Sequence, residues 1–282
     1  MRSTQPGLPV KSVGLDNCAM TATGWQRRVQ RAQELANQHP CAAEILGFYV
    51  QVTRWQEETF RQMSGPANLQ GSIGDELGER ELQELGSRFA SFLSVAEMHG
   101  PKSLAELSRE LRARGEETWS ALLNNVWMAR SPNDAPGYLA GAVLQPYAEL
   151  LRSRAPAQSV RHVSCVCTFC GYKPVAGVLR QLGEGAARSL ICGFCSNEWE
   201  FRRVVCPACG EENDRNLPVF TASEFDYIRI ECCDACKTYL KTIDLTRNGR
   251  AEPLVDEIAS PSLDLWASQQ GYAKVQRNLL GL

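Results

Sequence analysis

The chain has 282 residues, of which 44% are hydrophobic, and its formal net charge is −2 at neutral pH. This length is sufficient to bury a core and to form two domains. Charged residues interrupt every apolar run after a few positions, so the sequence excludes a transmembrane helix and predicts no membrane insertion. The near-neutral balance also argues against a protein that binds nucleic acid.

The cysteine content predicts the cellular compartment. The sequence contains 12 cysteines, and its first residues include two basic side chains but no long apolar stretch or cleavage site. We therefore expect residues 1–24 to be a disordered tail and not a signal peptide. Twelve cysteines in a chain without an expected export signal predict a reducing compartment, the cytoplasm. There, Cys-x-x-Cys pairs bind metal in preference to forming disulfides.

Residues 25–154 show a helical period throughout. Pro40 and the stretch 64–66 should end the first two helices, and Ser103 with Glu106 has the pattern of a capping box. A loop is expected over 131–137. The apolar stripes that support an all-α domain of about six helices are Ile45, Phe48, Tyr49, Val52 and Trp55, then Leu82, Leu85, Phe89, Phe92 and Leu93, then Trp119, Leu122, Leu123, Val126 and Trp127, then Leu139, Val143, Tyr147, Leu150 and Leu151.

The next quarter of the chain contains four Cys-x-x-Cys pairs. A Cys-x-x-Cys turn places two thiolates on one side of a tight loop and supplies half of a tetrahedral metal shell. Four such pairs are a specific signal, whereas a single pair is weak. We predict two closed four-cysteine sites that bind two metal ions per chain, iron or zinc, through Cys167, Cys170, Cys192, Cys195, Cys206, Cys209, Cys233 and Cys236.

The order of the pairs suggests how they are shared. Gly171 follows the first pair and Gly210 follows the third, where a positive φ helps the backbone turn around the sulfurs. The spacing from Cys167 to Cys192 is close to the spacing from Cys206 to Cys233. This repeat favours two consecutive rubredoxin or zinc-ribbon-like modules, and an interleaved arrangement is the alternative.

Other candidate ligands lie close to these pairs. Cys165 and Cys232 could replace a neighbouring cysteine, but the Cys-x-x-Cys geometry favours Cys167 and Cys233, so we interpret the extra thiols as packed or weakly hydrogen-bonded. His162 is expected to be an exposed linker residue. His39 lies at a helix end, where its side chain suits the terminal carbonyls.

The remaining elements complete an α+β multidomain fold. Strands are expected over 198–205, 225–230 and 239–243, and a terminal helix is expected over 263–280, docking across the domain junction through Leu265, Tyr272 and Leu279. The predicted division is a tail over 1–24, an all-α helical domain over 25–154, a first four-cysteine module over 160–203, a second over 204–250 and a C-terminal segment with a helix over 251–282.

The sequence resembles the FdhE-type formate dehydrogenase accessory proteins from about Trp25 onward. The strings that carry the resemblance are Arg31-Ala32, His39-Pro40, Cys170-Gly171-Tyr172-Lys173-Pro174-Val175, the series through Trp199, Arg203 and Cys209-Gly210, the run from Cys233 to Asp244, and Leu263-Asp264-Leu265-Trp266-Ala267. All eight cysteines expected from the family pattern are present.

The resemblance implies a cytoplasmic factor that is needed to produce active formate dehydrogenase and that binds its catalytic subunit. It implies no catalysis, and the sequence shows no nucleophile–base arrangement or phosphate-binding loop that would indicate an enzyme. It also implies rubredoxin-like metal sites that can hold iron.

Two alternative functions remain open. One is a rubredoxin-like electron-transfer or redox protein, since iron held by four thiolates can cycle one electron. The other is a nucleic-acid-binding zinc ribbon, which charge disfavours: residues 161–245 contain ten Lys or Arg and eleven Asp or Glu, before any thiolate is counted.

Overall fold

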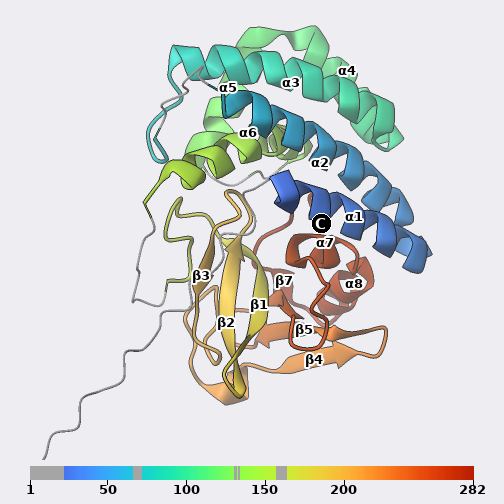
Figure 1. The fold of residues 1–282 in the computed structure, drawn as a ribbon, viewed down its shortest axis with the longest axis vertical. Helices are drawn as coiled ribbons and strands as arrows, with labels where there is room; N and C mark the ends of the chain where they lie inside the picture. Colours follow the sequence, from blue (N-terminus) through green and yellow to red (C-terminus); the bar gives the residue numbers. More distant parts are fainter. Residues whose placement is uncertain (1–21, 66–71, 130–131, 133, 157–163) are drawn as a thin grey trace, which may run out of the picture.

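The computed structural model describes residues 22–65, 72–129, 132, 134–156 and 164–282. Its fold is α+β, with a layer of helices packed against a twisted β-sheet (Figure 1). Most of the tail predicted over 1–24 lies outside the described residues, as does His162. Within the described part of the chain, no helix combines the length and the apolar character that a membrane span requires.

The helical layer forms from the apolar stripes predicted by the sequence. Side chains of these stripes, including Leu85, Phe89, Leu123 and Tyr147, are fully buried in one core. The helices are α1 (Ala22–Gln38), α2 (Ala43–Met63), α3 (Glu79–His99), α4 (Lys102–Arg114), α5 (Glu116–Ala129) and α6 (Ala135–Arg154), with the short 3-10 turn η2 (Pro40–Ala42) between α1 and α2.

Two predicted helix boundaries are wrong. The capping box at Ser103 does not form, because α4 begins at Lys102 and the flanking residue is Pro101, which makes no side-chain cap. The loop predicted over 131–137 is shorter, because α6 begins at Ala135. Asp134 caps this helix by accepting a hydrogen bond from the Gly137 N–H at 2.9 Å, and a proline is tolerated in a first helical turn.

One sheet joins the two predicted modules. Its strands are ordered β3-β2-β1-β6-β5-β4, and β7 pairs with β6. The link is the parallel pairing of β1 with β6, and the other neighbours in the main order are antiparallel. The strands are β1 (Pro174–Leu182), β2 (Gly185–Cys192), β3 (Glu198–Glu200), β4 (Val219–Ala222), β5 (Phe225–Cys233), β6 (Thr238–Asp244) and β7 (Ala273–Lys274), and the 3-10 turn η3 (Asp214–Asn216) precedes β4.

The β1–β2 hairpin was not predicted, and burial explains why. Residues 174–179 of β1 are all buried, so the strand lacks the alternation of apolar and polar residues that marks a half-buried strand. The strand predicted over 198–205 ends early, at Glu200. Beyond it, the Arg188 guanidinium donates hydrogen bonds to the carbonyls of Arg202 and Val205 and holds this segment as a loop.

The C-terminal segment crosses the junction between the layers, as predicted, but only part of it is helical. It forms α7 (Pro253–Ile258), α8 (Pro261–Gln269) and then β7, so the helix predicted to Leu280 ends at Gln269. Gly271 turns the chain with a φ of 84°. Leu265 is 62% exposed and does not dock, whereas Leu279 and Leu280 pack against the helical core. Figure 1 shows the C-terminus beside α1 and α7.

The helical layer also contacts the far end of the sheet. The His39 ring stacks on Phe225 with a centroid separation of 4.6 Å, and its Nδ1 lies 3.3 Å from Oε1 of Glu224. The side chain therefore joins the end of α1 to the β4–β5 turn, and the predicted contact of its ring with helix-terminal carbonyls was wrong.

Candidate metal centres

All four Cys-x-x-Cys pairs adopt the same tight turn. In three of them the first cysteine donates its N–H to the carbonyl five residues later, at 2.7–2.9 Å, and Cys233 is paired with Thr238 in the β5–β6 ladder. The residue after each second cysteine is left-handed: φ is 73° at Gly171, 54° at Ser196, 79° at Gly210 and 55° at Lys237. Glycine adopts this conformation freely, whereas Ser196 and Lys237 are strained there.

Backbone N–H groups point at the sulfurs inside these turns. The N–H of Phe169 donates to Cys167 Sγ at 3.4 Å, the N–H of Phe194 to Cys192 Sγ at 3.3 Å, and the N–H of Ala208 to Cys206 Sγ at 3.4 Å. Such bonds stabilise the thiolate form, which is the form that binds metal.

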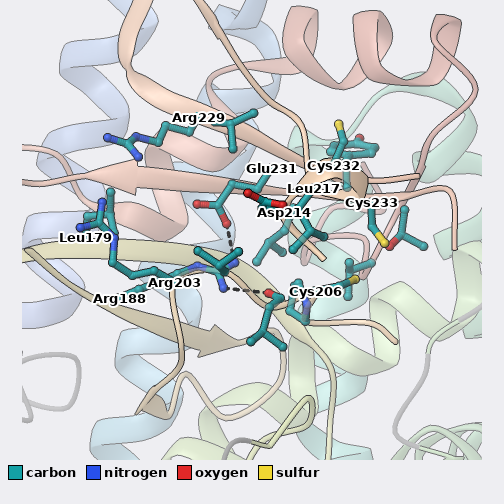
Figure 2. Close-up of a pocket in the computed structure, with 18 residues that line it drawn as sticks. Leu179, Arg188, Arg203, Cys206, Asp214, Leu217, Arg229, Glu231, Cys232 and Cys233 are labelled. Carbon is teal, nitrogen blue, oxygen red and sulfur yellow. Dashed lines mark hydrogen bonds and ion pairs between the residues drawn. The ribbon is translucent and has the colours of Figure 1, made fainter. Parts of the chain in front are cut away.

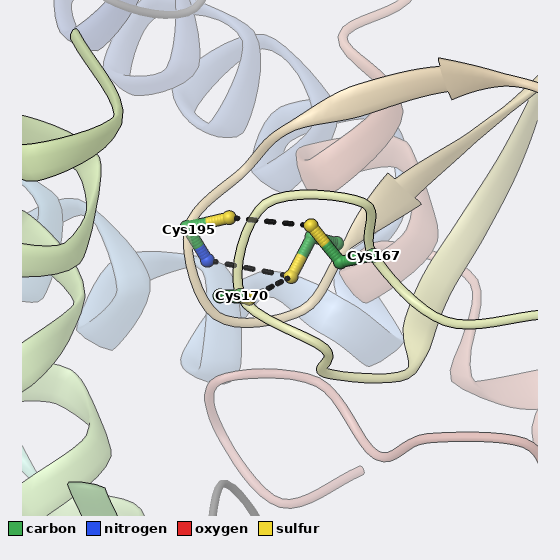
Figure 3. A group of neighbouring side chains, drawn as sticks. Cys167, Cys170 and Cys195 are labelled. Atoms are coloured by element: carbon green, nitrogen blue, oxygen red, sulfur yellow. Dashed lines mark hydrogen bonds between the residues drawn. The ribbon is translucent and has the colours of Figure 1, made fainter. Parts of the chain in front are cut away.

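The eight cysteines converge into two groups of four. Within each group the sulfurs lie within 4.8 Å of one another. Figure 3 shows Cys167, Cys170 and Cys195 converging from two loops. The groups follow the sequential order favoured by the sequence and not the interleaved one: the first four-cysteine group is Cys167, Cys170, Cys192 and Cys195, and the second is Cys206, Cys209, Cys233 and Cys236.

The sulfur–sulfur distances match a tetrahedral thiolate shell. A tetrahedron with metal–sulfur bonds of about 2.3 Å has edges of about 3.8 Å. The facing sulfurs are 3.6 Å apart for Cys167 and Cys195, and 3.4 Å apart for Cys170 and Cys192. In the second group they are 3.7 Å apart for Cys206 and Cys236, and 3.8 Å apart for Cys209 and Cys233. Each group is thus the donor set that zinc and iron accept in closed sites.

The two extra thiols stand outside both groups. The Cys165 thiol donates to the Cys206 carbonyl at 3.7 Å, so it bridges the loops without facing the sulfurs. Cys232 points into the apolar cluster of β5, β6 and α8. Burial, together with Asp234 and Glu231, raises the pKa of its thiol to about 12, which suits a packed and protonated side chain.

A buried ion pair fixes the first group to the helical layer. Glu149 of α6 is fully buried, and its Oε1 accepts hydrogen bonds from Arg28 at 3.2 Å and from Ser196 Oγ at 2.6 Å. Ser196 is the left-handed residue that follows Cys195. Burial raises the pKa of Glu149 and the charge of Arg28 opposes that rise. The sequence did not indicate this residue, because Glu149 lies away from the predicted apolar stripe of α6 and one turn from Gln145 and Arg152, a position typical of a solvent-exposed charge.

Aromatic rings cover the first group. Phe194, within the second pair, packs edge-on against Trp127 of α5 and stacks on Tyr172, with centroid separations of 5.7 and 5.5 Å. Asn197 donates to Cys167 Sγ at 3.6 Å and accepts a hydrogen bond from Arg152 of α6. The four cysteines consequently belong to the same apolar cluster as the helical core.

The second group lies closer to the surface. Cys206 and Cys233 are buried, Cys236 is half-buried and Cys209 is exposed. Burial raises the pKa of Cys236, but hydrogen bonds with Thr238 and the other three thiols outweigh it and lower that pKa to about 7. A thiol with this pKa is readily available as a thiolate near neutral pH.

A cleft of about 470 Å³ adjoins the second group (Figure 2). We call it the Val204 cleft. Its walls come from the loop 203–207, from β4, β5 and β6, and from Leu179 of β1. Cys206 and Cys233 line its inner end, whereas Val204 and Val219 are 51% and 52% exposed. Its charged groups are Arg188, Arg203, Arg229, Asp214 and Glu231.

A buried polar network locks the C-terminal segment onto β6. Lys241 is fully buried, and its ammonium donates to Asp264 Oδ2 at 2.6 Å and to Ser260 Oγ at 3.2 Å, with Glu257 Oε1 also 3.2 Å away. Lys274 of β7 contacts the same two acids. The network therefore connects α7, α8 and β7 to the strand that leaves the fourth cysteine pair.

Comparison with known proteins agrees with this architecture. The model for the FdhE central domain matches residues 166–203, and the model for the FdhE C-terminal domain matches residues 204–280. An FdhE homolog of Aquifex aeolicus is 28% identical over 90% of this chain and 94% of its own length, and one from Pectobacterium carotovorum is 28% identical over 90% and 86%.

The chain belongs to the FdhE family. Its fold is also similar to the crystal structure of the FdhE protein from Pseudomonas aeruginosa, with a TM-score of 0.68, 24% identity, and coverage of 92% of this chain and 96% of that one. Each FdhE domain model contains one complete four-cysteine group. The regions that the two FdhE models match therefore contain two cysteine groups that could hold metal ions.

Proposed function

We propose that this protein is a cytoplasmic accessory factor needed to form active formate dehydrogenase, and that it acts by binding the catalytic subunit of that enzyme and not by catalysis. The observation that carries the proposal is the pair of tetrahedral cysteine groups in the region that both FdhE models match. The family resemblance supplies the link to formate dehydrogenase.

We further propose that each cysteine group holds one zinc or iron ion through its four sulfurs. Such an ion supplies folding free energy, on the order of 10–16 kcal/mol for structural zinc. The ligands would be the residues named for the two groups. The charge balance of residues 161–245, with four further negative charges from eight thiolates around two divalent ions, disfavours binding to nucleic acid.

The mouth of the Val204 cleft is the best candidate for the surface that meets the catalytic subunit. Val204 and Val219 are exposed on its two sides, and Val166, beside the first group, is 41% exposed. Exposed aliphatic side chains with charged groups around them are typical of protein-binding surfaces. Arg188 donates hydrogen bonds to the carbonyls of Arg202 and Val205 and so holds the loop that carries Val204. Cys206 of the second group directly follows this loop, so an ion bound to Cys206 would also fix the position of Val204.

The experiment is a pull-down of the catalytic subunit with full-length Val204→Glu and Leu182→Glu proteins. Leu182 is 55% exposed at the tip of the β1–β2 hairpin and does not line the cleft, so it is a matched control. We expect a loss of binding of tenfold or more for V204E, since a charge buried against an apolar partner is costly, and no change for L182E. Equal binding by wild type and V204E would rule out this surface.

The wider proposal is tested in cells that lack the native protein. Formate dehydrogenase activity should depend on the wild-type chain and should be lost when both cysteines of one pair are replaced. Full activity without the chain, or no co-purification of the catalytic subunit with it, would refute the accessory function.

A further inference from the structure

We propose that the two cysteine groups differ in purpose: the second is an exchangeable site that opens through Cys209 to an incoming thiolate, whereas the first releases its ion only after local unfolding. The inference rests on the proposed binding of metal by the eight cysteines and deepens it. It follows from burial and from the packing around each group.

The first group has no open side. Its four cysteines are between 0% and 3% exposed. Phe194 lies against Trp127 and Tyr172, and Ser196 is held by the buried Glu149. A ligand could reach these sulfurs only after the helical layer separates from the cysteine loops, which is a local unfolding event.

The second group is built differently at the matching positions. Cys170 and Cys209 occupy the same place in their turns, since each is the second cysteine of its pair and each precedes a left-handed glycine. Cys170 is 1% exposed, whereas Cys209 is exposed. Among the described residues, no apolar cluster includes Cys206, Cys209, Cys233 or Cys236. The site therefore has a buried half and an open half.

The open half permits ligand exchange without unfolding. An incoming thiolate can approach on the side of Cys209, form one sulfur–metal bond and replace the bond to Cys209, whose thiolate then takes up a proton from water. Three sulfurs continue to hold the ion, and no electron is transferred. Cys236 is half-buried and is the next sulfur to be displaced, whereas Cys206 and Cys233 are buried at the inner end of the Val204 cleft.

This arrangement suits transfer of a thiophilic divalent ion to or from a cysteine-rich partner. The partner would reach Cys209 from solvent while the neighbouring cleft surface remains intact. The first group would meanwhile keep the sheet attached to the helices. The chemical class of the exchanging ligand is thus a thiolate, and glutathione is a suitable probe.

The test uses full-length protein loaded with two zinc ions per chain and an excess of a chromogenic chelator. We expect one ion to leave in a fast phase that accelerates with glutathione concentration. The ion of the first group should leave on the order of a hundredfold more slowly, because its release requires local unfolding. Glutathione should not change the rate of this slow phase. Alkylation with N-ethylmaleimide after the fast phase should label the cysteines of the second group and spare those of the first, with the exposed Cys41 as an internal reference.

The variants Cys209→Ser and Cys170→Ser provide the matched comparison. C209S should accelerate the fast phase, because only three sulfurs then hold the ion, and should leave the slow phase unchanged, whereas C170S should accelerate the slow phase alone. Should C170S fail to fold, the labelling pattern of the wild type still decides the question. Release of both ions in one phase, or first labelling of Cys167, Cys170, Cys192 and Cys195, would overturn the inference.

The result is separable from the proposed function. Single-phase release by a protein that still binds the catalytic subunit would remove only the exchange inference. Two-phase release by a protein that formate dehydrogenase does not require would remove only the accessory function. Folded protein that binds no zinc would remove the metal assignment on which the inference depends.

Discussion

Replacement of Lys241 tests whether buried charge, and not charge pairing as such, stabilises the C-terminal segment. The chain contains a close control. Lys241 and Lys237 stand four residues apart, and each places its ammonium 2.6 Å from an aspartate oxygen, Asp264 for one and Asp234 for the other. The Lys241 side chain is 0% exposed and the Lys237 side chain is 61% exposed. We compare Lys241→Met with Lys237→Met.

The expected magnitudes follow from burial. Loss of one partner of a buried pair costs about 3–5 kcal/mol, because the remaining charge stays in a medium of low dielectric. Glu257 is 1% exposed and would lose one of its two lysines. Lys274 still contacts both acids, so we expect the lower end of this range. The Lys237 pair is solvated on both sides, and its loss should not be measurable.

The assay is thermal and urea denaturation of metal-loaded protein. For a chain of this size, about 3 kcal/mol lowers the melting temperature by roughly 6–12 °C. K241M should show this shift, and K237M should melt with the wild type. Equal stability of all three proteins would refute the reasoning that burial makes the Lys241 network strong.

Three further predictions concern the metal region. Glu149→Gln should lower the free energy of unfolding by about 3 kcal/mol, because Arg28 keeps its charge in a buried site without the carboxylate. An unchanged urea midpoint would show that the Arg28–Glu149 pair does not stabilise the fold. Cys192→Ser should lower the melting temperature of the helical circular dichroism signal, since its group shares a core with α5 and α6, and Cys206→Ser should spare that signal; equal losses would contradict the difference in packing. Acidification should release metal from the protein, because thiolate ligands take up protons; elemental analysis after buffer exchange would show it, and an ion content independent of pH would exclude thiolate ligation.

Local features of the fold could be predicted from the sequence alone. The turns at Cys167–Cys170 and Cys206–Cys209 depend on residues within a few positions of each other, and Gly171 and Gly210 mark their left-handed exit. The stripes that bury Leu85 and Phe89 are likewise a matter of helical spacing. Even the sequential grouping of the cysteines follows from an approximate repeat in the chain.

Features that depend on distant segments were visible only in the tertiary structure. The β1–β2 hairpin lies within the first module, but its pairing with β6 joins both modules into one sheet. Glu149 holds Ser196 although the two are far apart in sequence, and a glutamate one helical turn from Gln145 and Arg152 gives no sign of a buried partner.

The sequence by itself determined the eight cysteines that form the two groups, their four turns and the helical layer, because each arises from spacing along the chain. The tertiary structure alone decided that Cys170 is sealed and Cys209 is open, although each is the second cysteine of a Cys-x-x-Cys pair and each precedes a glycine. Exposure depends on what packs over a residue. Here α5 and α6 cover the first group, and no corresponding layer among the described residues covers the second.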